Sequence, residues 1–250
     1  MTTSQEATTG TVASPEWTRR PANLARAVTR ELVDRIVRGL HPPGTPLPPE
    51  PALCEMFSVS RTVVREAVKI LQEKGLVQVR QGSGTVVTPP TRWNMLDELV
   101  LAATIAEEED GLAILDDLVV TRRLLESDMA NVAARVADQA TLDRLLELVD
   151  DHVVYEEHDR AFHDTVMQTS GNRIARAVVR SLESQVLHSE RYVGRTERSL
   201  CVASNLGHRR VYERIAARDP AGAAAAMFSH ITDAWLIRRN GPANPVRLQR

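Results

Sequence analysis

Cysteine is scarce in this sequence, which contains only Cys54 and Cys201 among its 250 residues. The two lie far apart and neither belongs to a CxxC pair, which argues against a disulfide framework and against a thiolate zinc site. Cysteine usage of this kind favours a reducing compartment, so we expect a cytoplasmic protein.

Long apolar runs and a leader-like N-terminus are also missing. No run approaches the ~18 apolar residues that span a bilayer, so we expect no membrane segment. The start, "MTTSQEATTGTVASPEW", lacks the basic and apolar regions of a signal peptide, and residues 1–20 are predicted to be a disordered tail. Aromatic residues make up 4% of the chain, while Ala, Val, Leu and Arg are abundant, which is typical of a helical protein with aliphatic packing.

Charge of one sign does not dominate, but it is unevenly distributed. The net charge is −2; residues 1–90 hold 11 Lys/Arg against 8 Asp/Glu, and residues 91–250 hold 20 against 25. A basic front part permits nucleic-acid binding there. The difference is too small to identify a partner without further signals.

The first 90 residues contain the pattern of a winged helix-turn-helix. Apolar residues every four positions predict a helix over 24–40, which "HPPGTPLPPE" ends. Shorter helices are predicted over 50–57 and 61–74, joined by "SVS" and with Ser60 as the N-cap of the second. The β-rich runs "LVQVR" and "GTVVT" flank "QGSG" and predict a hairpin. We assign residues 21–88 to this DNA-binding domain.

The rest of the chain is predicted to be helical. "TPPTRW" marks a linker over residues 89–94, followed by a helical domain over 95–240 and a flexible tail over 241–250. The fold class is therefore mainly α, with an N-terminal winged helix-turn-helix and a C-terminal all-α antiparallel bundle. Gly, Pro and turn residues predict helix breaks near Asp110–Gly111, Asp138–Gln139, Ser170–Gly171, Asn205–Gly207 and Asp219–Pro220.

The segment "FSVSRTVVREAVKILQEKGLV" carries the strongest signal in the front domain. One face of its helix is apolar, and the other bears Arg61, Thr62, Arg65 and Lys69. Such a helix suits the major groove, where Arg holds guanine bidentately and Thr or Lys contacts phosphate. The N-terminal end of a recognition helix reads the bases, which favours Arg61 and Arg65 over Lys69. A solvated basic face fits the helix alone equally well, and the surrounding turn and hairpin favour DNA binding.

The stretch "PPGTPLPPEPALCEMFSVSRTVVREAVKILQEKGLVQVRQGSGTVV" resembles the DNA-binding domain of GntR-type bacterial transcription regulators. The resemblance implies that Arg61 and Arg65 contact operator bases, Thr62 contacts phosphate and the wing glycine Gly82 enters the minor groove. It implies weaker backbone contacts for Ser60 and Gln81.

Two positions depart from the GntR pattern. Pro49 replaces the Ser or Thr that usually caps the second helix, which a first helical turn tolerates. Pro51 stands where relatives often carry a DNA-contacting Arg, so one contact is expected to be missing.

Four residues of the back domain have the chemistry of a metal site. Asp159 and His163, in "DRAFH", share a helix face at i and i+4, and His208 and His230 follow. Imidazoles with a carboxylate suit Zn, Ni, Co or Mn. Solvated surface side chains fit the same spacing.

The helical half is similar to the FCD domain, the ligand-binding domain of the FadR subgroup. The resemblance rests on "TRWNMLDELVL", "VVTRRLLESDMANVAA", "DRAFHDTVMQTSGN" and "GHRRVYERIAARDPAGAAAAMFSHI". It implies that Asp159, His163, His208 and His230 bind a divalent metal, with zinc preferred. The stretch "DRLLELVDDHVVYEEHD" looks shorter than the usual connection, which puts the pocket wall there in question.

Arg122 matches an arginine that commonly faces the FCD pocket. A guanidinium beside a metal suits a small carboxylate, because its fork binds bidentately. The alternative is a salt bridge from Arg122 to Glu126, one turn on.

Together these features predict a ligand-responsive transcription regulator, a repressor, that binds a palindromic operator as a homodimer. A small organic or sugar acid is the expected effector; "RWNML" is similar to relatives that sense sugar acids. The protein would be bacterial, cytoplasmic and associated with the nucleoid when bound to DNA. Two alternatives remain open: a metal-sensing repressor, and a metal-dependent hydrolase, for which we find no separate general-base motif.

Overall fold

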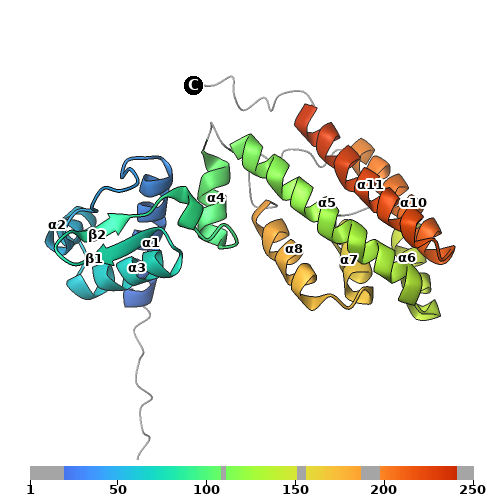
Figure 1. The fold of residues 1–250 in the computed structure, drawn as a ribbon, viewed down its shortest axis with the longest axis horizontal. Helices are drawn as coiled ribbons and strands as arrows, with labels where there is room; N and C mark the ends of the chain where they lie inside the picture. Colours follow the sequence, from blue (N-terminus) through green and yellow to red (C-terminus); the bar gives the residue numbers. More distant parts are fainter. Residues whose placement is uncertain (1–19, 108–110, 151–155, 187–197, 241–250) are drawn as a thin grey trace, which may run out of the picture.

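The computed structural model of the chain describes residues 20–107, 111–150, 156–186 and 198–240. Figure 1 shows a winged helix-turn-helix and a bundle of long helices, with the short helix α4 between them. The predicted fold class is confirmed. The predicted tails, 1–20 and 241–250, lie outside the described residues except for Arg20, which begins α1.

The N-terminal region has the predicted order of elements. These are α1 (Arg20–Val37), α2 (Glu50–Phe57), α3 (Arg61–Glu73), β1 (Val77–Arg80) and β2 (Gly84–Val87). The first helix does not reach Leu40 as predicted. Gly39 adopts a left-handed φ of 73°, and the N–H groups of Gly39 and Leu40 bond back to the carbonyls of Ile36 and Arg35. A glycine C-cap therefore ends α1 before the prolines begin.

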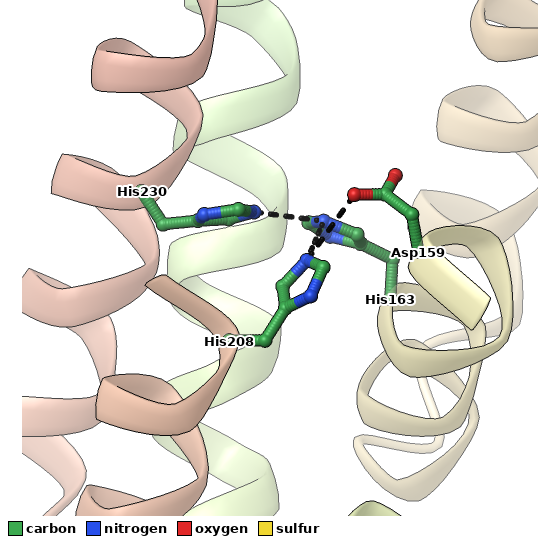
Figure 2. A group of neighbouring side chains, drawn as sticks. All are labelled: Asp159, His163, His208 and His230. Carbon is green, nitrogen blue, oxygen red and sulfur yellow. Dashed lines mark hydrogen bonds and ion pairs between the residues drawn. The ribbon is translucent and has the colours of Figure 1, made fainter. Parts of the chain in front are cut away.

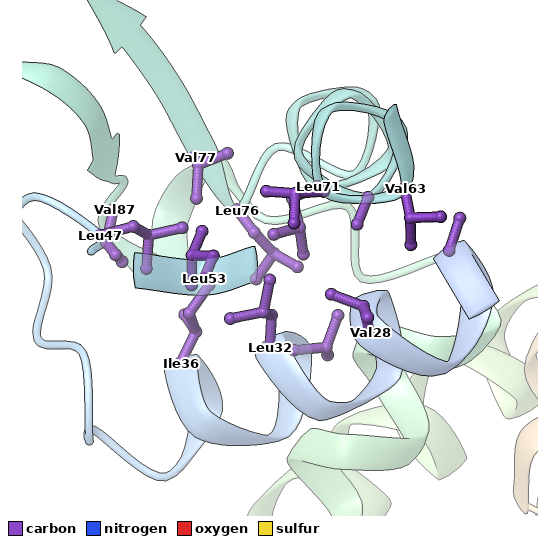
Figure 3. Close-up of a cluster of buried hydrophobic side chains, with 14 of the residues drawn as sticks. Val28, Leu32, Ile36, Leu47, Leu53, Val63, Leu71, Leu76, Val77 and Val87 are labelled. Atoms are coloured by element: carbon purple, nitrogen blue, oxygen red, sulfur yellow. The ribbon is translucent and has the colours of Figure 1, made fainter. Parts of the chain in front are cut away.

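Aliphatic side chains fill the space between these elements (Figure 3). The four-residue spacing places Val28, Leu32 and Ile36 on one side of α1, where each is at most 4% exposed. They meet buried residues of the other elements, which are Leu47, Leu53, Val63, Val64, Ala67, Leu71, Leu76, Val77 and Val87. The apolar side of α3 is therefore used for packing, and its opposite side is left for other contacts.

Local caps fix the ends of α2 and α3. The Ser60 hydroxyl accepts from the N–H of Val63 at 3.5 Å, as predicted for an N-cap. Helix α2 begins after Pro49 without a side-chain cap and holds Pro51 in its first turn, so both prolines are tolerated. The antiparallel hairpin pairs Val77 with Val87, and residues 81–83 form its turn.

The segment predicted as a linker packs against the winged helix. It contains a short 3-10 helix, η1 (Pro90–Arg92). The indole N–H of Trp93 donates to the carbonyl of Thr88 at 3.2 Å, and the N–H of Asn94 donates to the carbonyl of Lys74 at 2.9 Å. These bonds hold the chain on the winged helix up to the start of α4.

Helix α4 (Glu98–Ala106) contributes to both halves of the molecule. Its Val100 is buried in the winged-helix core. Its Leu101 and Ile105 are buried in a second cluster together with bundle residues Leu115, Leu118, Leu182 and Trp235. The domains are thus joined through a packed helix.

Long helices make up the bundle. They are α5 (Gly111–Val136), α6 (Gln139–Asp150), α7 (Glu156–Thr169), α8 (Arg173–Val186), α10 (Arg198–Ala216) and α11 (Pro220–Asn240). Helices α5 and α11 pack along each other (Figure 1). The helix breaks predicted at Asp138–Gln139, Ser170–Gly171 and Asp219–Pro220 are confirmed, and α5 begins at Gly111 as expected. None of the described helices is long and apolar enough to cross a membrane.

The break predicted at Asn205–Gly207 is wrong. Helix α10 runs unbroken from Arg198 to Ala216, so His208 lies within a helix and not near its start. Gly207 is buried at a contact with His230 of α11. The glycine therefore serves helix packing, which local sequence pattern does not distinguish from a turn.

Candidate metal centre and DNA-reading surface

The bundle brings the four predicted metal ligands to one point (Figure 2). Asp159 and His163 come from adjacent turns of α7, His208 from α10 and His230 from α11. One ligand atom from each residue lies within 4.8 Å of all the others. Residues that are up to 71 positions apart in sequence are thus combined by the antiparallel packing of three helices.

The spacing of the donor atoms suits a single ion. His163 Nε2 lies 3.1 Å from His230 Nε2 and 3.3 Å from His208 Nε2. His208 Nε2 lies 3.4 Å from Asp159 Oδ1. Two ligands of a tetrahedral ion, each ~2.0–2.1 Å from it, are roughly 3.3 Å apart. The residues present therefore fit a divalent metal ion.

The three histidines are buried, at 2%, 1% and 4% exposure for His163, His208 and His230. Phe162 covers one side, with its ring stacked 4.4 Å from that of His208. Burial lowers the pKa of His208 to about 4, and burial followed by the neighbouring His208 lowers the pKa of His230. Both imidazoles are therefore neutral near pH 7, which is the form that binds a metal.

Asp159 supplies the negative charge of the donor set. Burial opposes its ionisation, but His208, His163 and His230 in their protonated forms outweigh that effect and lower the pKa of the carboxyl. The hydroxyl of Ser204 donates to Asp159 Oδ1 at 2.9 Å. A carboxylate held in this way is ready to neutralise part of the charge of a divalent cation.

Glu126 of α5 supports the site, and the sequence interpretation considered it only as a salt-bridge partner of Arg122. It is fully buried, and its Oε2 lies 2.5 Å from Nδ1 of His163. Burial would raise the pKa of Glu126, but Arg122 and then His163 lower it to about 2. Nδ1–H of His163 donates to this carboxylate. In the neutral ring, this leaves the lone pair of Nε2 directed at the other metal ligands.

Burial also opposes protonation of His163, but the Glu126 carboxylate outweighs this effect and raises the pKa of the imidazole. A metal bound at Nε2 would occupy the position of the second proton. The Glu126–His163 pair therefore suits a bound cation, whether proton or metal.

A sequence signal for Glu126 did exist. Helix α5 has a buried stripe at helical spacing, and Glu126 stands within it among Leu115, Leu118, Met129, Ala130 and Ala133. A charged residue in the middle of an apolar stripe needs a buried partner. Arg122 at i−4 offered Glu126 a partner within the same helix, so no partner on another helix was sought.

Arg122 has features of both interpretations, since it forms salt bridges and also lines a cavity. Its Nε donates to Glu126 Oε1 at 2.7 Å, which is the salt bridge considered as the alternative, and its guanidinium also pairs with Glu183 of α8 at 2.8 Å. Arg122 nevertheless lines the cavity beside the metal ligands, together with Trp235 and other residues. That cavity measures about 30 Å³. Such a volume admits one or two water-sized species.

The predicted DNA-contacting residues lie on α3, at its N-cap and on the hairpin turn. All of them are exposed: Ser60, Arg61, Thr62, Arg65, Lys69, Gln81 and Gly82. Gly82 has a φ of 80°, a conformation that favours glycine at the tip of the wing. Arg65 pairs with Glu50 of α2 at 3.0 Å, and both side chains are largely exposed. An exposed pair of this kind is weak, so Arg65 can leave it for a base.

Family comparisons agree with this architecture. The profile of bacterial regulatory proteins, gntR family, matches residues 24–87, and that of the FCD domain matches residues 117–233. LutR, an HTH-type transcriptional regulator of Bacillus subtilis, is 30% identical over 202 residues, which cover 76% of this chain and 90% of LutR. The chain belongs to the GntR family. It is a DNA-binding transcription regulator with an FCD ligand domain, consistent with a FadR-like subgroup.

Other relatives of this GntR regulator are regulators as well. YieP of Escherichia coli K12 is 36% identical over 159 residues, which cover 60% of this chain and 69% of YieP. The repressor NanR of Cronobacter sakazakii is 29% identical over 231 residues, with 87% of each chain covered. The solved structure of Lar from Listeria monocytogenes shares the fold with a TM-score of 0.55 at 17% identity, over 88% of this chain and 98% of Lar. The chain is thus a regulator and not an enzyme.

Proposed function

We propose that this regulator is a repressor whose FCD domain holds a divalent metal ion at Asp159, His163, His208 and His230. A small organic acid, with sugar acids as the first candidates, would bind beside the metal and weaken operator binding. Zinc is the first candidate for this ion, with Ni, Co and Mn as alternatives. The regulator would act in the bacterial cytoplasm, on the nucleoid when bound to DNA.

One observation supports the metal above all others. Three imidazole nitrogens and a carboxylate oxygen converge in the core. Three pairs of these atoms are 3.1–3.4 Å apart, and all four atoms lie within 4.8 Å of one another. Buried polar atoms normally have dedicated partners. A cation at the shared point would satisfy all four donors at once, and Glu126 would orient the His163 ligand from outside.

Arg122 is the proposed anchor for the acid. Its guanidinium lines the cavity and pairs with Glu183, so an incoming carboxylate would replace Glu183 at the guanidinium. The cavity of about 30 Å³ is far smaller than the roughly 300–1,000 Å³ of ordinary ligand pockets. Binding the acid therefore requires the cavity lining to move.

This movement has a route to the DNA-binding domain. Trp235 lines the cavity and packs in the same cluster as Leu101 and Ile105 of α4. Leu182, next to Glu183 in sequence, belongs to that cluster too. Because α4 is anchored in the winged-helix core by Val100, displacing it would move the wing. In a homodimer on a palindromic operator, such a shift would move the two recognition helices out of their half-sites.

A metal-sensing repressor is the second candidate, and the small cavity favours it. Four protein donors are the number that structural tetrahedral sites use, and the space beside them suits an ion and water. In that case the metal alone would change operator affinity. A hydrolase is not proposed, because tetrahedral sites with four protein ligands are structural and catalytic sites keep an open position.

A thermal-shift screen of sugar acids and small carboxylates, with and without chelator, tests the proposal. We expect one class of acid to raise the melting temperature of the metal-loaded protein and to lose this effect after chelation. Arg122→Lys should reduce the acid-dependent shift, because lysine keeps the charge but lacks the planar fork. A purified wild-type protein that contains no metal and takes up none on titration would refute the metal site.

A further inference from the structure

Gly207 lies where helix α10 comes nearest to a metal ligand on another helix. A Cβ atom added at Gly207 would lie 3.0 Å from Cγ and 3.3 Å from Cβ of His230, and nearer still to its Nδ1. The approach to Nδ1 is closer than real Cβ atoms come to a neighbour, and the other two separations are tighter than most, so the imidazole or the helix would have to shift. The bare Cα of Gly207 therefore makes room for the ring of His230.

The close approach follows from the packing of α10 on α11. Val211 and Ile215 of α10 are buried in one cluster with Ala223 and Met227 of α11. The small alanine lets the two helices come together over this stretch. Asn205 and Arg209 further hold α10 in place, since both donate to the carbonyl of Val149 on α6 at 2.9 and 3.0 Å. These bonds tie α10 to α6 and oppose its retreat from an added methyl group.

Helix stability alone does not account for a glycine at this position. Gly207 lies well inside α10, where glycine is less favourable than alanine because it loses more backbone entropy on folding. The residue is buried and has an ordinary helical conformation, so no positive φ requires it. What it does provide is space on the side that faces His230.

The position of the His230 ring matters for the donor set. Figure 2 shows the ring reaching from α11 towards His163. Its Nε2 lies 3.1 Å from Nε2 of His163, and its ring centre lies 4.4 Å from that of His208. A ring pushed away from α10 would move against these two imidazoles or carry Nε2 off the shared point.

We propose that Gly207 is a positioning residue of the metal centre: it seats the His230 imidazole against the backbone of α10 and so aims Nε2 at the other ligands. This inference rests on the proposed metal site. It concerns a residue that touches no metal and acts only through His230.

A double-mutant cycle tests the contact without metal. The melting temperatures of metal-free wild type, Gly207→Ala, His230→Ala and the double variant would be compared. We expect Gly207→Ala to lower the melting temperature in the wild-type background and not in the His230→Ala background, where the methyl group has room. Should Gly207→Ala fail to fold, folding of the double variant would give the same support. An equal loss in both backgrounds would overturn the inference.

Cobalt binding then tests the positioning role. We expect Gly207→Ala to bind Co²⁺ about 10–100-fold more weakly than wild type, as is typical for residues that orient ligands, and to change its visible absorption spectrum. Leu206→Ala, at an exposed neighbouring position of α10, is the matched control and should leave both unchanged. Wild-type affinity and spectrum in Gly207→Ala would overturn the inference while leaving the proposed function intact. Absence of cobalt binding by wild type would instead refute the metal site itself.

Discussion

The two halves of this regulator keep their functional side chains in opposite environments. Among the described residues of the winged helix, the buried polar residues are two threonines, and the predicted DNA-contacting residues are all exposed. The bundle buries three histidines and a glutamate around its predicted metal centre. We therefore expect function and stability to be separable in the first half and coupled in the second.

The difference follows from what each half must recognise. A duplex is read by a surface that protrudes, so the recognition helix needs a core only as a support. A metal ion is bound by converging donors, and a dry site strengthens their electrostatic interactions. Burying those donors has a cost, which Arg122 and Glu126 offset by providing each buried charge with a partner.

The largest expected effect on stability comes from removing the buried carboxylate of Glu126 in the bundle. Glu126→Ala removes the carboxylate partner of His163 and one of the two carboxylate partners of Arg122, and removing one member of a buried ion pair typically costs roughly 3–5 kcal/mol. Chemical denaturation of the metal-free protein measures this loss. The matched exposed pair is Glu50–Arg65, where Glu50→Ala should change stability by no more than about 0.5 kcal/mol. Equal losses for the two variants would contradict the contrast between the halves.

The next effect concerns the metal. His208→Ala removes one of four donors, so metal content by elemental analysis should fall towards zero. The melting temperature of the variant should also stop responding to added metal. A metal ion stabilises a folded protein only by binding to it, and the gain is about 2.7 kcal/mol when the metal concentration is 100 times the dissociation constant. His158→Ala, on α7 but outside the donor set, is the control. Full metal occupancy in His208→Ala would remove this residue from the site.

The winged helix should respond in the opposite way. Arg65→Ala should weaken operator binding by ~1–3 kcal/mol and relax base preference at one position, since its guanidinium would read a base. Its stability should stay within about 0.5 kcal/mol of wild type, because the side chain is exposed. A gel-shift titration with operator variants measures the first effect, and unchanged binding would refute the base-reading role.

The smallest effect separates phosphate contacts from base contacts. Lys69 lies further along α3, where a phosphate contact is expected. Lys69→Ala should weaken binding to all sequences alike and reduce the slope of log affinity against log salt by about 0.9, the value for one phosphate contact. Binding measured at several salt concentrations gives the slope. A loss confined to one operator sequence would make Lys69 a base reader instead.

The sequence predicted the winged helix better than the bundle, for physical reasons. Its elements are short, and local signals such as the Ser60 cap and the glycine-rich turn fix their ends. In the bundle, Asp219 was recognisable as a helix start because it caps α11: the N–H of Gly222 donates to its side chain at 2.9 Å. Gly207 was taken for a break because local pattern does not reveal that another helix packs on it.

The site was predicted in part. The family resemblance selected the four donors, and the structure brings all of them together. Glu126 was not recognised because its support of His163 joins residues 37 positions apart. The ion pair of Arg122 with Glu183 of α8 joins residues that are still further apart in the sequence. Such partners depend on the packing of helices, which periodicity does not determine.

Operator binding of wild-type protein under four conditions tests the central claim most directly. Fluorescence anisotropy would compare metal-free protein, metal-loaded protein, and each of these with the acid found in the thermal-shift screen. The account predicts that the acid weakens operator binding only when the metal is present, and that metal alone changes it little. Release of the operator by metal alone, or by the acid without metal, would contradict it.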